Sequence, residues 1–195
     1  MKILQKELIK ELITITVVVL NILENFRILD KDTLNWREND QKWSILECIE
    51  HLNLYGEFYI PECKKRIHPH LISSISPLYF KSGWLGNYFA KMMLPSDKSK
   101  KMDSPKDKNP IFSNLDKSVL DKFAEQQIEI LELLKVSQGL NLTKIKTSIS
   151  ISNFIKLRLG DTFRVVIFHN LRHIVQAENI LKTLKTADFQ RNEVA

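Results

Sequence analysis

A helical period in the stretch VLDKFAEQQIEILELLKVS, residues 119–137, constrains the fold more than any other feature of the chain. Apolar side chains recur there every three or four residues, and only Gln127 interrupts the series. Side chains at this spacing lie on one face of an α-helix, so the stretch predicts a helix that buries that face against other elements. Gly139 follows its end, where glycine commonly terminates a helix.

Three other segments indicate long helices. They are residues 4–28, residues 44–60 with a continuation to residue 66 if the helix passes Pro61, and residues 162–185. Ser44 and Glu47 have the spacing of a capping box, in which each side chain accepts a hydrogen bond from the backbone amide of the other residue. Only five glycines occur in 195 residues, which favours helices over a turn-rich β-sandwich. Four long helices predict an all-α fold, a four-helix bundle, and we expect residues 1–195 to form a single domain.

The connection between the second and third helices is long. Residues 68–115 contain five of the six prolines, and we expect an irregular, lysine-rich insertion with one short helix at residues 84–93. After the third helix, residues 143–152 alternate loosely between apolar and polar side chains and are expected to form an extended connector. We expect residues 153–159 to form a short helical turn before the last helix.

Residues 12–20, LITITVVVL, are strongly apolar and raise the question of a targeting segment. No small-residue cleavage site follows them, and the uncharged run is well short of the roughly 20 apolar residues that a membrane span needs. We therefore expect a buried helix and no membrane partner. Because β-branched residues form helices poorly, a strand is the alternative.

Charge and cysteine content bear on partners and location. Residues 91–108 hold six lysines and three aspartates, so half of the formal charge of +6 lies in this segment. The segment predicts a solvated loop, with a phosphate-binding strip as the alternative. No arginine or aromatic side chain is interleaved to stack on bases, so we expect no nucleic-acid partner. Cys48 and Cys63 are too few for a disulfide framework, which favours a reducing, cytoplasmic location.

Three of the five histidines form a candidate metal site. His169 and His173 are four residues apart in a predicted helix, where their imidazoles lie one above the other. His51 lies two turns into another predicted helix, and metal sites in bundles are assembled from facing helices. Three imidazoles suit a zinc-like divalent metal and leave positions for water or substrate. Spacing alone does not show that the two helices face each other, and Asn170 stands where a zincin carries glutamate, so a structural role is the alternative.

Two motifs add a family resemblance. WSILECIEHL, residues 43–52, has the pattern W-s-x-x-E-x-x-x-H-L, and HNLRHIVQ, residues 169–176, has the pattern H-x-x-R-H-x-x-Q. With the order of the helices and the long connection, these motifs resemble the DinB-like family. That family belongs to the DinB/YfiT superfamily of metal-binding four-helix bundles, which includes thiol-dependent S-transferases.

The resemblance implies that His51, His169 and His173 are metal ligands, with nickel, zinc or iron as the metal. It implies an enzyme that uses a low-molecular-weight thiol of the bacillithiol type for S-transfer or conjugation to a small-molecule substrate. A metal-dependent hydrolase is the second interpretation. A non-catalytic, metal-stabilised bundle that binds a small ligand or a partner is the third. Bundles of this kind often pair, which makes a homodimer one possible assembly, although the sequence does not determine the oligomeric state.

Residues near the three histidines have two interpretations each. Gln176, one turn after His173, either orients that imidazole or bonds between helices. Arg172 either holds a substrate carboxylate or forms a structural ion pair. Glu47 either acts as a general base through water at the metal or only caps its helix. Cys48 is either a fourth ligand or, as we favour, a small buried side chain.

Four further residues are assigned to the scaffold. Trp43 and Tyr55 are expected in the core rather than in the wall of a substrate site. His68 and His70 flank Pro69 and are expected in a surface loop, away from any metal.

Overall fold

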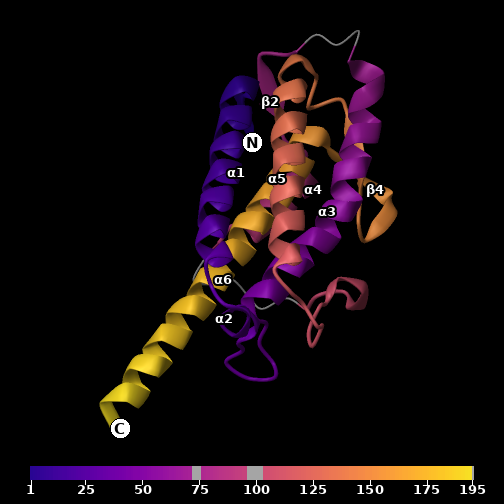
Figure 1. Cartoon of the computed structure of the whole chain (residues 1–195). Coiled ribbons are helices and arrows are strands. Elements are labelled where there is room, and N and C mark those ends of the chain that lie inside the picture. The colour runs from indigo at the N-terminus through magenta and orange to yellow at the C-terminus, as the bar shows by residue number, and fades with distance from the viewer. Residues whose placement is uncertain (72–75, 96–102, 195) are drawn as a thin grey trace.

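The computed structural model describes residues 1–71, 76–95 and 103–194, and four long helices dominate it (Figure 1). They are α1 (Gln5–Arg27), α3 (Ile45–Ile67), α5 (Ser118–Val136) and α6 (Leu159–Val194). The four lie side by side in one bundle, which confirms the predicted all-α fold. The C-terminal part of α6 extends past the other three helices (Figure 1).

The apolar segment near the N-terminus is helical, as expected, and is not a strand. Leu12, Thr16 and Val19 are buried at helical spacing, and the Thr16 hydroxyl donates a hydrogen bond to the Leu12 carbonyl, 2.9 Å away. Burial of this face stabilises a helix whose β-branched residues have low intrinsic propensity. No helix of the described residues combines the length and the apolar character that a membrane crossing requires.

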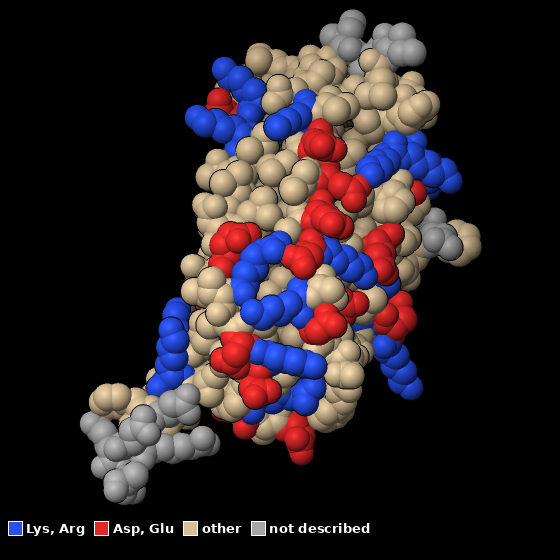
Figure 2. All heavy atoms as spheres, in the orientation of Figure 1, with Lys and Arg blue, Asp and Glu red and all other residues tan. Residues whose placement is uncertain are grey.

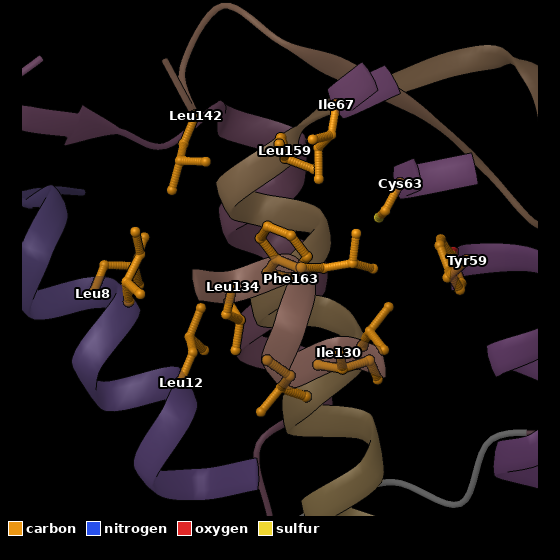
Figure 3. Packing of buried hydrophobic residues seen from close by; sticks show 14 of the residues in the cluster. Leu8, Leu12, Tyr59, Cys63, Ile67, Ile130, Leu134, Leu142, Leu159 and Phe163 are labelled. Carbon is orange, nitrogen blue, oxygen red and sulfur yellow. The ribbon is translucent and has the colours of Figure 1, made fainter. Parts of the chain in front are cut away.

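Apolar side chains from all four helices fill the centre of the bundle (Figure 3). Those labelled in the figure include Leu8 of α1, Tyr59 of α3, Leu134 of α5 and Phe163 of α6. Removing each such side chain from water contributes about 1.5–3 kcal/mol, so the packing fixes the helices relative to one another. It therefore holds α3 and α6, which carry the three candidate ligands, at a defined separation.

Short elements connect the long helices. They are α2 (Lys31–Asn35), η1 (His68–His70), β2 (Tyr79–Lys81), α4 (Trp84–Met93), η2 (Lys106–Lys108) and η3 (Ser137–Gly139). The short helix expected at residues 84–93 is therefore present as α4. β2 pairs antiparallel with β1 (Lys2–Leu4), which ties the long connection to the start of the chain.

A β-hairpin replaces part of what the sequence led us to expect before α6. β3 (Lys146–Ile149) and β4 (Ser152–Arg158) pair antiparallel around a turn at Ser150 and Ile151. The expected helical turn at residues 153–159 is wrong, because that stretch is strand up to residue 158 and α6 begins at Leu159. Strand pairing satisfies the backbone of the hairpin, a segment that contains four β-branched residues and Phe154, residue types that prefer extended backbone.

A buried ion pair fixes α4 against the first turns of α6. The Asp161 carboxylate accepts hydrogen bonds from the Ser82 hydroxyl and from the Gly83 amide, the latter at 2.7 Å. Arg164 lies 3.2 Å from the same carboxylate and donates to Asn87 of α4 at 3.3 Å. Both charged side chains are almost fully buried, and each has its partners, which is the condition for a buried ion pair to be tolerated.

The surface drawn in Figure 2 carries lysine and arginine side chains mixed with aspartate and glutamate. Charges of both signs alternate over its central part, so that region has no single-sign patch. The predicted lysine loop lies only partly in the described chain, since Lys98, Lys100 and Lys101 are outside the described residues. The described lysines at its end, Lys106 and Lys108, belong to η2.

Candidate metal centre

The imidazoles of His51, His169 and His173 meet between α3 and α6. Each offers a ring nitrogen, and these nitrogens all lie within 4.8 Å of one another. Nε2 of His51 is 3.2 Å from Nε2 of His169. Two nitrogens bound to zinc at about 2.05 Å with tetrahedral angles are about 3.3 Å apart, so this pair already has the spacing of metal ligands.

Hydrogen bonds at the other ring nitrogen orient two of the three imidazoles. Nδ1 of His51 lies 2.6 Å from the backbone carbonyl of Lys108, and Nδ1 of His173 lies 2.9 Å from Oε1 of Gln176. A carbonyl oxygen only accepts, so each Nδ1 carries the proton and each Nε2 presents its lone pair. A metal-binding histidine is normally held in this way, with its second nitrogen bonded to a carbonyl or a carboxylate.

Burial keeps the three imidazoles neutral. It lowers the pKa of His51 to about 4 and that of His173 to about 3, and it places the pKa of His169 well below its usual value. The Lys108 cation acts in the same direction as burial on the pKa of His51. The neighbouring imidazoles and Arg172 do so on the pKa values of His169 and His173, whereas the bonds to the Lys108 carbonyl and to Gln176 oppose the shift in His51 and His173. Neutral imidazole is the form that binds metals, so the cluster is ready to bind at neutral pH.

A family model described as the DinB superfamily matches residues 21–177, a range that contains all three histidines. The chain belongs to the DinB superfamily. Searches of curated proteins and of solved structures return no match. Three converging imidazoles in a DinB-superfamily bundle form a group that can hold a divalent metal ion.

Two aromatic side chains form walls of this DinB-superfamily site. The ring of Trp43 lies 4.7 Å from that of His51 and 5.7 Å from that of His173. Tyr55, one turn after His51 on α3, meets His51 edge-on at 5.0 Å and His169 at 4.9 Å. Both side chains are half-buried and pack against the hydrophobic core, as expected, and the same rings also cover the histidine cluster from two sides.

The end of the long connection closes over the cluster from a third side. Lys108 contributes its carbonyl to His51, and Asn109 accepts a hydrogen bond from Nε1 of Trp43 at 3.1 Å. Phe112 adopts φ 63°, a conformation that bulky residues keep only when their surroundings fix it, and its amide donates to Glu47 at 2.6 Å. These contacts were not predicted, because a backbone carbonyl leaves no signature in the sequence.

In this superfamily member, the Glu47 carboxylate accepts hydrogen bonds from neighbouring groups of the scaffold. The capping box with Ser44 is present, and the Glu47 carboxylate also receives two bonds from Arg37, at 2.6 and 2.9 Å. Burial alone raises the pKa of this carboxyl, but the bonds from Arg37 and from the Ser44 and Phe112 amides outweigh it and leave the pKa below its usual value. The carboxylate therefore joins the start of α3 to the loop that covers the three histidines.

Arg172 and Cys48 also have defined surroundings. Arg172 donates to the carbonyl of Met92, 2.9 Å away at the end of α4, so it ties that helix to α6 beside the histidines. Cys48 is fully buried in the apolar core, where burial raises the pKa of its thiol, and it is not part of the three-histidine group. His68 and His70 are exposed in η1, where a surface position was expected.

Proposed function

We propose that His51, His169 and His173 bind one divalent metal ion and that the protein is a metal-dependent thiol S-transferase. The observation that supports this most strongly is the orientation of the imidazoles. Nε2 of His51 and Nε2 of His169 converge, while Nδ1 of His51 and of His173 are occupied by carbonyl acceptors. A histidine cluster with only a packing role has no need for two fixed tautomers that direct lone pairs into one space.

The donor set fits an open site. Three neutral nitrogen donors suit zinc, nickel or iron, and three protein ligands leave positions for a substrate, whereas structural zinc sites are closed by four. Cys48, the nearest cysteine in sequence, is buried in the core and does not complete a fourth position. A divalent metal in this site supplies Lewis acidity, which lowers the pKa of a thiol towards neutrality.

The proposed reaction forms a carbon–sulfur bond. A low-molecular-weight thiol of the bacillithiol type gives its proton to solvent water, and its sulfur attacks an electrophilic carbon. A leaving group such as chloride departs with the bonding pair, or an epoxide opens and its oxygen takes up a proton. Trp43 and Tyr55 exclude water from two sides of the histidines, which limits protonation of the thiolate and hydrolysis of the electrophile.

The superfamily supports this reaction through its thiol-dependent S-transferases, and the two cysteines are compatible with a reducing location. Cys48 and Cys63 are both buried and unpaired, as expected where small thiols keep cysteines reduced. We therefore propose a cytoplasmic protein that acts on small molecules.

Metal analysis of three purified proteins tests the site. We expect about one zinc, nickel or iron per chain in the wild type and in a His70→Ala variant, which loses an exposed imidazole, and little metal in a His169→Ala variant. An equal metal content per chain in all three proteins would show that His169 is not a metal ligand. The metal-loaded protein should then consume a small thiol in the presence of an epoxide or a chlorinated aromatic compound. Metal binding without consumption of thiol would favour a hydrolase or a non-catalytic bundle.

A further inference from the structure

Two segments that are far apart in the sequence carry positive charge without any acidic side chain. They are β2 with α4, residues 79–93, and the β3–β4 hairpin, residues 146–158. Together they hold five cations and no aspartate or glutamate, whereas the net charge of the whole chain is +6. The cations are Lys81, Lys91, Lys146, Lys156 and Arg158. Positive charge is thus concentrated on two elements that contribute no residue to the three-histidine group.

Contacts of Arg158 hold the two segments side by side. Its guanidinium donates a hydrogen bond to the Lys81 carbonyl at 2.5 Å. The backbone at Gly83 is equally close, since a Cβ atom there would lie 3.6 Å from Nε of Arg158. Trp84, the next residue, begins α4. The end of β4 and the start of α4 are therefore neighbouring parts of one surface.

The hairpin turns its basic face away from the bundle. Leu157 is buried, and successive side chains of a strand point to opposite faces, so Lys156 and Arg158 point outward. Lys146 lies opposite Arg158 on β3, and Phe154 follows Lys156 on the same face of β4. Three cations and one aromatic ring thus share the outer face of the hairpin.

Apolar side chains stand out from the same surface. Phe154 is 97% exposed and Trp84 is 83% exposed. The ring of Trp84 stacks on that of Tyr88, one turn further along α4, with centroids 6.4 Å apart. Tyr88 and Ile151, at the turn of the hairpin, are exposed as well. Single exposed apolar residues are common, whereas a group of them beside cations marks an interaction site.

Acids next to these segments each have a cation beside them. The pairs are Glu62 with Arg66, Asp107 with Lys108 and Asp161 with Arg164. Each pair adds no net charge, so the electrostatic potential of the surface follows from its own five cations.

A bilayer with anionic lipids fits this surface better than a second copy of the chain or a nucleic acid. In a symmetric dimer the same face meets itself, which would bring five cations against five. Single-stranded nucleic acids stack their bases on aromatic rings, but the exposed apolar group here includes Ile151, an aliphatic side chain on which no base stacks. Tryptophan and tyrosine favour the boundary between water and lipid, and lysines beside them bind anionic headgroups.

We propose that this surface binds peripherally to a bilayer that contains anionic lipids. Lys81 and Lys156 contact the headgroups, while the rings of Trp84 and Phe154 enter the boundary with the acyl chains. The expectation of no membrane partner concerned a spanning or targeting segment at residues 12–20, and binding to the surface of a bilayer requires neither. The binding does not depend on a metal at the histidines.

Sedimentation of the full-length protein with lipid vesicles tests the charge requirement. Vesicles of phosphatidylcholine alone are compared with vesicles of equal parts phosphatidylcholine and phosphatidylserine. We expect the wild type to bind only the anionic vesicles, and added salt to weaken this binding. Lys81→Gln with Lys156→Gln should lower the partition coefficient about 30-fold, since each cation near an anionic bilayer contributes about fivefold. The matched control, Lys182→Gln with Lys185→Gln, removes two exposed lysines from α6 and should bind as the wild type does.

The apolar requirement has its own variants. Phe154→Ser should lower the partition coefficient about tenfold, because the ring no longer enters the bilayer. Phe189→Ser, at an exposed position on α6, is the control and should have no effect. Trp84 also reports on its surroundings, because it is exposed while Trp36 and Trp43 are partly buried. Tryptophan emission should shift to shorter wavelength on the anionic vesicles, and Trp84→Phe should abolish the shift.

Three results would overturn the proposal. The first is a wild type that does not bind the anionic vesicles, or that binds both kinds of vesicle equally. The second is an equal loss of binding in the two pairs of lysine variants, which would show that only net charge matters. The third is binding to an oligonucleotide of mixed sequence, or self-association that Trp84→Phe abolishes, in place of binding to vesicles. Each of these leaves the proposed metal site untouched.

Discussion

The imidazole of His51 donates a hydrogen bond from Nδ1 to the backbone carbonyl of Lys108, 2.6 Å away and 57 positions further along the chain. This bond joins the candidate metal ligand on α3 to the long connection that encloses the site. Ser104 supports the same carbonyl with a hydrogen bond from its hydroxyl at 3.0 Å. The loop therefore helps to determine which nitrogen of His51 faces the metal position.

The corresponding contact of His173 uses a side chain and can be removed by substitution. Replacement of Gln176 by alanine leaves Nδ1 of His173 without its acceptor, so the ring loses its fixed tautomer and orientation. We expect the zinc affinity to fall about 10- to 100-fold, measured by competition with a chromophoric chelator. Gln190→Ala, at an exposed position further along α6, is the control and should bind zinc as the wild type does. Equal affinities in the two variants would show that Gln176 does not position the ligand.

Glu47 is expected to stabilise the fold through its bonds to Arg37 and to the loop. Glu47→Gln keeps the shape and the capping position but removes the charge that two arginine nitrogens bind. We expect a loss of about 2 kcal/mol in the free energy of unfolding, because hydrogen bonds to charged groups contribute about 1.5–3 kcal/mol. The control, Glu57→Gln, removes an exposed partner of Lys122 and should change stability by less than about 0.5 kcal/mol. Urea denaturation measures both variants, and equal losses would contradict the expectation.

The same carboxyl predicts how this contribution depends on pH. Its pKa in the folded protein lies below the 4.5 of a free glutamate, so the unfolded chain binds the proton more readily. The stabilisation is therefore fully present above that value and is lost as the pH falls through the folded pKa. The difference in unfolding free energy between wild type and Glu47→Gln should be constant at neutral pH and shrink in acid. A difference that grows on acidification would reverse the assigned sign.

The helices could be predicted from the sequence because periodicity and capping are local signals. The Ser44–Glu47 capping box marked the start of α3, and the 3.6-residue period marked α5. The β3–β4 hairpin was missed at residues 153–158, because a short strand is defined by the partner with which it pairs, and that pairing is not local. Gly139 was expected to end α5 by its conformational freedom, but no described glycine has a positive φ, and the helix ends through the turn η3.

The ligand set of the candidate site could be named from two motifs, whereas its enclosure could not. His51, His169 and His173 stand in the motif positions that the family resemblance uses, and the structure brings their nitrogens together. The contributions of Lys108 and Asn109 come from a connection with no regular period, so their distance from the histidines could not be predicted. Hydrogen bonds to His51 and Trp43, rather than local propensity, hold these two residues beside the site.

A pair of glycine substitutions tests how tightly α4 is pressed against α6. A Cβ atom at Gly86 would lie 2.5 Å from the side chain of Asp161, which is buried and fixed by Gly83 and Arg164. Since neither side can move without breaking that network, we expect Gly86→Ala to cost about 1–3 kcal/mol in the free energy of unfolding.

Gly139→Ala is the matched change, because a Cβ there meets no atom within 4 Å and φ is not positive. This substitution should leave the free energy of unfolding unchanged or raise it by up to about 1 kcal/mol, since alanine restricts the unfolded chain. Urea denaturation of both variants beside the wild type measures the contrast. If Gly86→Ala were as stable as Gly139→Ala, α4 could not be seated directly on Asp161, and its place beside the histidine-bearing helix would have to be revised.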